Sequence, residues 1–486
     1  MFDLIKILRK KAFKNSKNFL FLFLLKVSFV YGGAFKRTSD LENLKEKQLA
    51  DSIKQKVKAK GLKLSSLGLI ISSLEEKTES IYSLHADKLF IPASLAKIPT
   101  LLSLYHFYPL SYTFKTSFIS SSLVEKGILK GDLILKGGGD SSFTSESLWK
   151  LVNVLTRSNL KQVEGHLLID SSLYQTETDL EESERSYLAP SGASSFNWNS
   201  VAFYIRPGTK LKDPAFVYAN PQNLYIEVLN KVKTGTKNKI VIKRKKLFKN
   251  KEVFEIRGEI DLKETEIVKY RSIKKPALWL GYNALAFLKQ RGIQISKGVK
   301  EGSCQSSCFV LAEWKSRAFP FHSYNMMKYS SNFVTRMLVS HLPLLEGAKK
   351  GDLDLGMKKI QTYLNQKGFR DLTLEEPSGL SRNNKLSPRD IKKSLLLIEN
   401  QYYKPEFLSS YPLARGEGTL EKRFENLPPK SFVRAKTGSL SGVLGLAGWA
   451  GSETKQYVFV FIFNGSPEKM QKAKDLFDET LLLLIN

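Results

Sequence analysis

A long block of short strand and turn patterns lies between two segments with helical patterns, and this order constrains the fold more than any other feature. From about residue 112 to 310, short apolar runs alternate with turns, for example at 131–135, 165–169 and 201–205. Helical periodicity precedes this block and returns after His322. Because domains are built from layers of helices and sheets around a core, the order predicts an α/β (α+β) domain interrupted by an inserted β-rich one.

The flanking segments carry recognisable element patterns. The predicted elements are a charged helix over 41–60, a β-hairpin over 67–84, a helix over 91–108, an amphipathic helical segment over 326–338, strands over 443–447 and 457–463, and a closing helix from Ser466. Within the block, Gly137-Gly-Gly-Asp140 predicts a sharp turn, because glycine tolerates positive φ at little cost. The Lys-dense span 231–251 is typical of an exposed strand and loop.

Composition and charge limit the classes of protein to consider. The 486 residues are 42% hydrophobic and 25% charged, as in globular proteins, and contain no apolar run of the roughly 18 residues that a membrane-spanning helix needs. The 76 Lys and Arg exceed the 47 Asp and Glu by a net charge of +29. This excess indicates either an anionic wall or membrane surface as partner or a lysine-rich composition without function. The sequence has no zinc-finger or RNP-like motif, so we expect no nucleic acid partner.

The N-terminus resembles an export signal. A basic segment from Lys6 to Lys17 precedes an apolar run over 19–25 and a second one over 27–30. Val30-Tyr31-Gly32 fits a cleavage site after Gly32, so we expect a signal peptide over residues 1–32 and a location in the periplasm or exported cell envelope. Lys26 interrupts the apolar run, which leaves a retained anchor as the alternative.

The cysteines and histidines offer no metal site. The chain has two cysteines, Cys304 and Cys308, and no nearby histidine completes a tetrahedral zinc set. In an exported chain this pair is a disulfide candidate that stiffens one hairpin. The five histidines are scattered and form no HExxH motif, so we expect them to be surface or packing residues, and we expect no metal and no cofactor.

The strongest candidate for chemistry is Ser94-Leu-Ala-Lys97. A serine near a helix start lies close to free backbone N–H groups, and a lysine one turn later lies on the same helix face. A free lysine has a pKa of about 10.4 and is protonated, so burial or a neighbouring cation must lower that pKa before the amine can act as a base. Ser-x-x-Lys also occurs at Ser147 and elsewhere in the chain, so the motif alone decides nothing.

Two further motifs give this pair significance, namely a Ser-x-Asn and a Lys-Thr-Gly in the same order along the chain. One completion is Ser330-Ser-Asn332 with Lys436-Thr-Gly438, and the rival is Ser195-Phe-Asn197 with Lys233-Thr-Gly235. Apolar strands follow Lys436 closely, whereas Lys233 lies in a polar, lysine-rich turn. The context therefore favours the set of Ser94, Ser330 and Lys436.

The complete pattern resembles the penicillin-binding D-alanyl-D-alanine carboxypeptidases and endopeptidases that carry a large insertion between the first two motifs. Pro92-Ala-Ser-Leu-Ala-Lys97 resembles their nucleophile motif, and Glu376-Pro-Ser-Gly-Leu-Ser-Arg382 resembles a stretch between the second and third motifs. Pro99 departs from the family pattern; inside a helix it would cost about 3 kcal/mol and introduce a kink.

The resemblance implies a β-lactamase-like catalytic domain of antiparallel sheet flanked by helices, formed by residues 33–111 and 315–486, with 112–314 as the inserted β-rich domain or domains. It also implies a serine-type hydrolase that cleaves D-Ala-D-Ala peptides of peptidoglycan through an acyl-enzyme and is inhibited by β-lactams. A β-lactamase and a non-catalytic envelope-binding protein remain the alternatives. The implied catalytic residues are Ser94, Lys97 and Ser330, and the implied substrate-binding residues are Asn332, Lys436, Thr437, Gly438 and Ser439.

Overall fold

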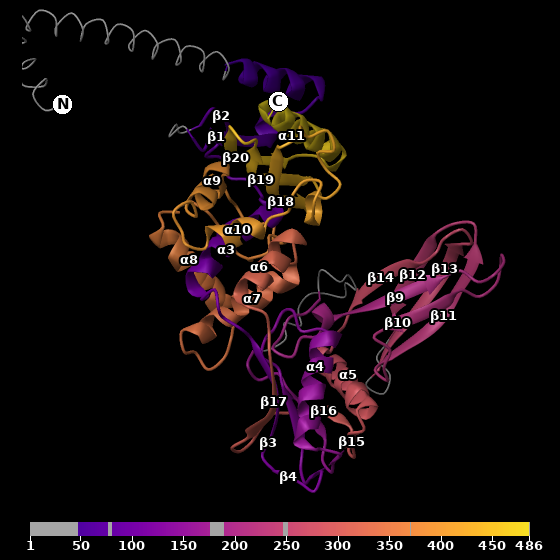
Figure 1. Ribbon diagram of the computed structural model, residues 1–486. Helices are drawn as coiled ribbons and strands as arrows, with labels where there is room; N and C mark the ends of the chain where they lie inside the picture. Colours follow the sequence, from indigo (N-terminus) through magenta and orange to yellow (C-terminus); the bar gives the residue numbers. More distant parts are fainter. Residues whose placement is uncertain (1–46, 76–79, 175–188, 246–250, 370, 486) are drawn as a thin grey trace, which may run out of the picture.

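The computed structural model describes residues 47–75, 80–174, 189–245, 251–369 and 371–485 (Figure 1). The predicted signal peptide over 1–32 lies outside these residues. Within the described ranges, no helix has both the length and the apolar character needed to cross a membrane. The predicted α/β fold is confirmed, and the chain forms a main domain and an insert that extends away from it (Figure 1).

A five-stranded antiparallel sheet forms the centre of the main domain. The strand order is β18-β19-β20-β1-β2, so the first and last parts of the chain share one sheet. Its strands are β18 (Phe432–Leu440), β19 (Val443–Gly451), β20 (Gln456–Asn464), β1 (Leu67–Ser73) and β2 (Tyr82–Leu84). The predicted hairpin and both predicted C-terminal strands are therefore confirmed.

The sheet is buried on both faces. Phe459, Phe461 and Phe463 of β20 point to one side and join a core with the helix over residues 47–59 and with α11 (Met470–Ile485). Because side chains alternate along a strand, Val458, Val460 and Ile462 point to the other side and join the core beneath the remaining helices. The result is a three-layer arrangement with a helical pair on one face.

The second helical layer contains the predicted helix after residue 91 and most of the chain between the insert and β18. Its elements are η2 (Ala93–Ala96), α3 (Lys97–Phe107), α6 (Phe319–Lys328), α7 (Asn332–Leu345), α8 (Leu353–Gln366), α9 (Pro388–Leu396), α10 (Lys404–Ser409) and η6 (Gly418–Leu420). Tyr105 of α3 contacts Phe319, Tyr403 and Phe407, with ring centroids 4.9 to 5.5 Å apart. These contacts tie α3 to the segments on either side of α8 and α9.

The first part of the insert is a five-stranded sheet with two helices and a smaller sheet. The large sheet contains β16 (Val299–Glu301), β8 (Leu167–Asp170), β6 (Leu133–Lys136), β3 (Lys115–Ser120) and β17 (Phe309–Lys315), and the small one contains β15 (Gln294–Ile295), β7 (Gln162–Val163), β5 (Ile128–Leu129) and β4 (Val124–Glu125). Helices α4 (Ser145–Leu155) and α5 (Pro276–Gln290) pack against these strands. Cys304 and Cys308 form a disulfide in the loop before β17.

The second part of the insert, residues 200–272, is a lobe of two three-stranded sheets that projects away from the main domain (Figure 1). One sheet contains β10 (Phe216–Asn220), β9 (Ser200–Arg206) and β14 (Ile267–Ser272); the other contains β11 (Ile226–Gly235), β13 (Glu252–Asp261) and β12 (Lys239–Arg244). Phe203 of β9 meets Phe254 of β13 in the core between them, with ring centroids 5.1 Å apart.

The chain enters and leaves the insert at one place. β3 and β17 pair antiparallel, and at their ends the backbone N–H of Ser316 donates to the carbonyl of Phe114 (2.9 Å) while the Phe114 N–H donates to the Ser316 hydroxyl (2.9 Å). The insert is therefore attached through two adjacent strands.

Candidate active site

Ser94 and Lys97 lie together at the start of α3. Ser94 is in the 3₁₀ turn η2, Lys97 is the first residue of α3, and Lys97 Nζ lies 3.1 Å from Ser94 Oγ. The three-residue spacing turns both side chains to the same face, as expected from the sequence. Pro99 is the third residue of α3, where the backbone N–H groups have no partner within the helix. The predicted cost of about 3 kcal/mol is therefore wrong.

The Lys97 amine is completely buried and makes hydrogen bonds to three acceptors. It donates to Asn332 Oδ1 (2.7 Å) and to the Ser378 carbonyl (2.5 Å), in addition to Ser94 Oγ. Burial lowers the pKa of Lys97 from 10.5 to about 7, against the opposing influence of the Glu376 carboxylate. At neutral pH a large fraction of this amine is uncharged, which is the state that a general base requires.

The second motif lies in a sharp turn and not within a helix. The predicted helical segment over 326–338 is interrupted, because α6 ends at Lys328 and α7 begins at Asn332. Ser330, between them, has a φ of +54°, and Ser331 caps α7 by accepting from the Val334 N–H. This turn directs Asn332 to Lys97 and Ser330 to the third motif, so the interruption brings the two halves of the site together.

The third motif lies on β18 at the edge of the central sheet. Lys436 Nζ is buried and donates to Ser330 Oγ and to the Thr437 carbonyl, both at 2.7 Å. Burial, together with the charge of Lys97, holds the pKa of Lys436 well below its ordinary value. The hydrogen bonds therefore form two groups, Lys97 with Ser94 and Asn332, and Lys436 with Ser330, which lie close enough for the charge of Lys97 to affect Lys436.

Gly438 allows β18 to approach the nucleophile. A Cβ atom at this position would lie 3.0 Å from the Pro92 carbonyl oxygen and 3.2 Å from the Ser94 nitrogen, so a side chain would push the strand away. Ser439 is exposed, and Thr437 is half-buried with its hydroxyl donating to Thr419 Oγ1 at 2.8 Å. Thr437 and Ser439 alternate with Lys436 and Gly438 along β18, so their two hydroxyl side chains share one face of the strand.

The turn from Glu376 to Gly379 contributes to the site in a way that the sequence reading missed. Ser378 supplies the carbonyl that accepts from Lys97, and a Cβ on Gly379 would lie 1.9 Å from the Ala93 oxygen. Gly379 has a φ of +88° and Ala93 a φ of +47°, a costly conformation for a non-glycine residue. The backbone just before Ser94 is therefore held by a close contact that requires glycine.

An ion pair between the buried Lys328 amine and the partly exposed Glu417 carboxylate lies beside the second and third motifs, and the sequence did not indicate it. Lys328 is completely buried and forms an ion pair with Glu417, which also accepts from the Tyr324 hydroxyl at 2.6 Å. Glu417 stands two residues before Thr419, the hydrogen-bond partner of Thr437. No spacing in the sequence signals this pairing, because the partners lie 89 positions apart.

The other candidates lie elsewhere. Ser195, from the rival set, is buried with its hydroxyl donating to the Gly192 carbonyl, while Lys233 is exposed on β11 in the lobe. His322 and His341 are buried packing residues. Among the described residues no cluster of three His, Cys, Asp or Glu side chains fits a metal ion.

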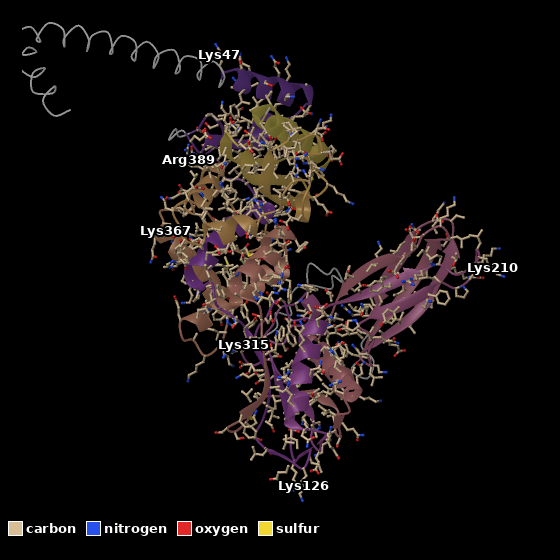
Figure 2. The ribbon with its side chains drawn as sticks, viewed as in Figure 1. Lys47, Lys126, Lys210, Lys315, Lys367 and Arg389 are labelled. Carbon is tan, nitrogen blue, oxygen red and sulfur yellow. A yellow bond between two sulfur atoms is a disulfide. The ribbon has the colours of Figure 1, made fainter. Side chains whose placement is uncertain are left out.

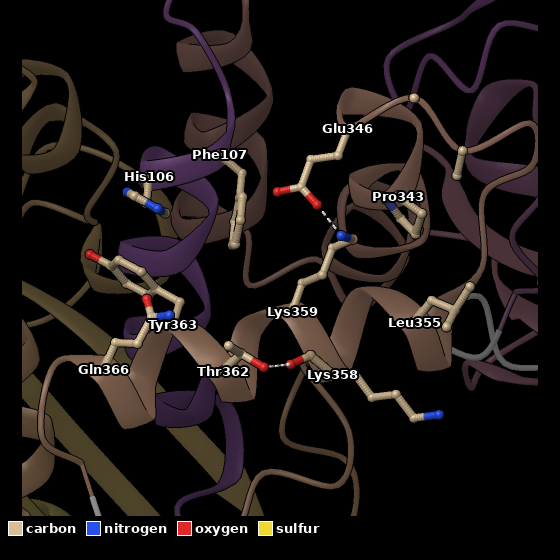
Figure 3. A pocket seen from close by; sticks show the side chains of 12 residues that line it. His106, Phe107, Pro343, Glu346, Leu355, Lys358, Lys359, Thr362, Tyr363 and Gln366 are labelled. Carbon is tan, nitrogen blue, oxygen red and sulfur yellow. Dashed lines mark hydrogen bonds and ion pairs between the residues drawn. The ribbon is translucent and has the colours of Figure 1, made fainter.

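A pocket of about 740 Å³ lies at the far end of α3 from Ser94 (Figure 3). His106 and Phe107 line it together with the end of α7 and the side of α8, where Tyr363 stacks on His106 at a ring-centroid distance of 4.4 Å. The helix from Lys97 to His106 is about 14 Å long at 1.5 Å per residue. This pocket is therefore separate from the Ser94 site.

Comparison with known proteins places the whole described chain in one group. A sequence model of the D-Ala-D-Ala carboxypeptidase 3 (S13) family matches residues 49–481. The D-alanyl-D-alanine carboxypeptidase DacB of Haemophilus influenzae is 23% identical over 416 residues, covering 82% of this chain and 86% of that protein. The D-alanyl-D-alanine carboxypeptidase of Actinomadura sp. (strain R39) is 24% identical over 412 residues, covering 80% and 76%.

The fold is shared with a solved structure as well. The crystal structure of penicillin-binding protein 4 from Haemophilus influenzae matches with a TM-score of 0.71 at 20% identity, covering 85% of this chain and 96% of that one. The same protein complexed with a novel β-lactam matches with a TM-score of 0.69.

Proposed function

The chain belongs to the D-Ala-D-Ala carboxypeptidase 3 (S13) family, and on this premise we propose that Ser94 is the nucleophile of a serine-type D-Ala-D-Ala peptidase acting on peptidoglycan stem peptides. The observation that carries the proposal is the buried Lys97 amine, 3.1 Å from Ser94 Oγ, with a pKa lowered to about 7. An uncharged amine at this distance can take the hydroxyl proton as the oxygen attacks the peptide carbonyl.

The first chemical step forms an ester between Ser94 and the penultimate D-alanine. As the bond from Ser94 Oγ to the carbonyl carbon forms, the hydroxyl proton moves to Lys97 Nζ. The N–H groups of Ser94 and Ser439 would form the oxyanion hole, and the close passage of β18 past Ser94 supports this arrangement. Cleavage of the C–N bond between the two D-alanines then releases the terminal D-alanine with a free amino group.

Ser330 is suited to deliver a proton to that leaving amine. Lys436 Nζ contacts the Ser330 hydroxyl at 2.7 Å, whereas Asn332 contacts Lys97. Lys436 can thus restore the proton that Ser330 gives up. During hydrolysis of the ester, the attacking water returns a proton to Lys436 through Ser330, and Lys97 returns its proton to Ser94 Oγ. Lys436 and the Thr437 hydroxyl also provide a cationic and hydrogen-bonding site for the substrate carboxylate. Water then hydrolyses the ester, and a β-lactam would leave Ser94 blocked.

The test compares Ser94→Ala with Ser147→Ala, a serine in another Ser-x-x-Lys sequence that lies on α4. We expect Ser94→Ala to abolish covalent labelling by a fluorescent penicillin and the release of D-alanine from a pentapeptide, while Ser147→Ala retains both. Stoichiometric labelling of Ser94→Ala would refute the assignment. Labelling without D-alanine release by the wild type would favour the non-catalytic binding protein, and rapid penicillin turnover would favour the β-lactamase.

Carboxypeptidase and endopeptidase activity can be distinguished by comparing a pentapeptide substrate with a cross-linked dimer. We propose that carboxypeptidase activity is the faster of the two, because the Lys436 amine and the Thr437 hydroxyl suit a free terminal carboxylate. The rate of D-alanine release from a pentapeptide should then exceed the rate of cleavage of a cross-linked dimer. A faster reaction with the dimer would overturn this preference.

We also propose that the chain is exported to the cell envelope, where its lysine-rich surface contacts anionic wall or membrane. The basic and apolar N-terminal pattern and the disulfide between Cys304 and Cys308 both support an oxidising compartment. Lysines 231, 233, 239 and 243 alternate along β11 and β12 and are exposed. A mature N-terminus other than Gly33 would count against cleavage after Gly32, and unchanged envelope association after neutralising these lysines would count against the contact.

A further inference from the structure

One sheet of the lobe presents a row of aromatic side chains on its outer face. In the antiparallel pairing, Tyr218 of β10 lies opposite Tyr204 of β9, and Phe216 lies opposite Arg206. Tyr270 of β14 lies opposite Ala202 of β9, two residues from Tyr204 and therefore on the same face. We call Phe216, Tyr218, Tyr204 and Tyr270 the aromatic face.

The aromatic face takes no part in the core of the lobe. The alternate residues of the same strands, Phe203, Ile205 and Val217, point inward and pack with the second sheet. By contrast, Phe216 is 68% exposed, Tyr218 49% and Tyr270 53%. Folding does not require large apolar rings on the solvent side of a strand, and a contiguous exposed patch of this kind marks an interaction site.

The chemistry of the face suits a ligand that is apolar on one surface and polar at its edges. Tyrosine presents an apolar ring with a polar tip, and the exposed side chains of Arg206 and Asn220 lie on the same face. A pyranose ring matches this, since its C–H groups stack on an aromatic ring while its hydroxyl and acetamido groups reach outward. β10 and β14 flank β9, so Tyr218 and Tyr270 are two strand spacings apart across the sheet and two residues apart along it. Their separation is therefore about 12 Å, slightly more than the length of one disaccharide.

The charge of the lobe indicates which glycan fits. Residues 200–272 contain 17 Lys and Arg against eight Asp and Glu, and Lys210 lies at the outer end of the lobe (Figure 2). A glycan whose attached peptides end in carboxylates is complementary to this excess. We propose that the aromatic face binds the glycan strand of peptidoglycan, holding the polymer while its peptides reach the Ser94 site. This proposal rests on the proposed function for the identity of the polymer.

The binding test is designed to be independent of catalysis. All variants are made in the full chain with Ser94→Ala, so that loss of turnover cannot affect the result. Retention is measured on insoluble glycan from which the stem peptides have been removed, and is competed with a soluble β-1,4-linked N-acetylglucosamine hexamer. The test variant is Tyr218→Ala with Tyr270→Ala, and the control is Tyr402→Ala, a 74% exposed tyrosine of the main domain.

We expect the parent chain and Tyr402→Ala to bind the stripped glycan and to be displaced by the hexamer. The double variant should bind at least about ten-fold more weakly while keeping the parent's circular dichroism spectrum. The proposal is overturned if the double variant binds like the parent, if the hexamer does not compete, or if the parent binds anionic vesicles but not stripped glycan. A dimer that dissociates in the double variant would also overturn it, because the face would then pair two copies of the chain.

Discussion

Replacing Lys97 with methionine should make the stability of the main domain less dependent on pH. The folded pKa of Lys97 is about 7 and its unfolded value is 10.5, a difference of about 3.5 units or roughly 5 kcal/mol. Because the folded pKa is the lower one, the burial penalty is fully present below pH 7 and disappears as pH rises to 10.5. Methionine, of similar length, carries no such penalty at any pH.

The difference in the free energy of unfolding between wild type and Lys97→Met should change with pH. Hydrogen bonds lost from Ser94, Asn332 and Ser378 contribute an offset that does not vary with pH. On top of this offset, the free energy of unfolding of the wild type should rise relative to the variant by about 2 kcal/mol between pH 7 and pH 9. Lys436 adds to this change in the same direction, because the charge of Lys97 also lowers the pKa of Lys436.

The assay must report the main domain alone, since the chain is too large for a single two-state transition. Hydrogen exchange of peptides from α3 and β18 along a urea gradient, measured by mass spectrometry at pH 7, 8 and 9, gives the free energy of opening at the site. Lys210→Met, in the exposed tip of the lobe, serves as the control. A difference between wild type and Lys97→Met that stays constant from pH 7 to pH 9 would refute the buried, uncharged amine and with it the proposed general base.

Three further predictions address the site. The kcat/KM for D-alanine release should fall about ten-fold per pH unit below pH 7 and level off above it, because Lys97 must be uncharged; a flat profile from pH 5 to 8 would contradict this. Gly379→Ala should lower the rate of acylation by a fluorescent penicillin by about 100-fold, since its Cβ would displace Ala93 beside the nucleophile; a rate within two-fold of the wild type would show that the contact relaxes harmlessly. Glu417→Gln should lower the free energy of opening of the main domain by about 1–3 kcal/mol, because Lys328 remains buried without its counter-charge. Equal hydrogen-exchange free energies for α6 and β18 peptides of wild type and variant along a urea gradient would argue against the ion pair.

The parts of the site that follow local rules could be predicted from the sequence. Ser94 and Lys97 are one helical turn apart, and apolar strands follow Lys436 directly. The pairing of Ser94 with Lys97 and the position of Lys436 in a sheet could therefore be predicted from residues that are neighbours in the sequence. The break at Ser330 was not predicted, because Met326, Met327 and Met337 continue a helical period across it. The spacing of the core residues does not indicate that Ser330 has a positive φ, which interrupts the helix.

The contacts between distant segments could not be predicted in the same way. Lys97 Nζ donates to Asn332 Oδ1 and to the carbonyl of Ser378, which is 281 positions away, and only the packed fold brings that carbonyl to the amine. A sequence pattern marked the stretch around Ser378 through its resemblance to the family but gave it no role. The lowered pKa of Lys97 likewise depends on complete burial, which the folded core produces and no single motif encodes.

The paired strands β3 and β17 have a consequence for how such a protein can change over time. Their ends next to the main domain meet at Phe114 and Ser316, which are joined by two hydrogen bonds of 2.9 Å. A short peptide link at that point could replace everything between them without stretching the remaining chain. A single genetic insertion at this buried junction therefore suffices to introduce the appendage. Tyr174, Ala189 and Ala193 of the insert pack in the core of the main domain, so the outer lobe is the part that can diverge while the hydrolytic machinery stays unaltered.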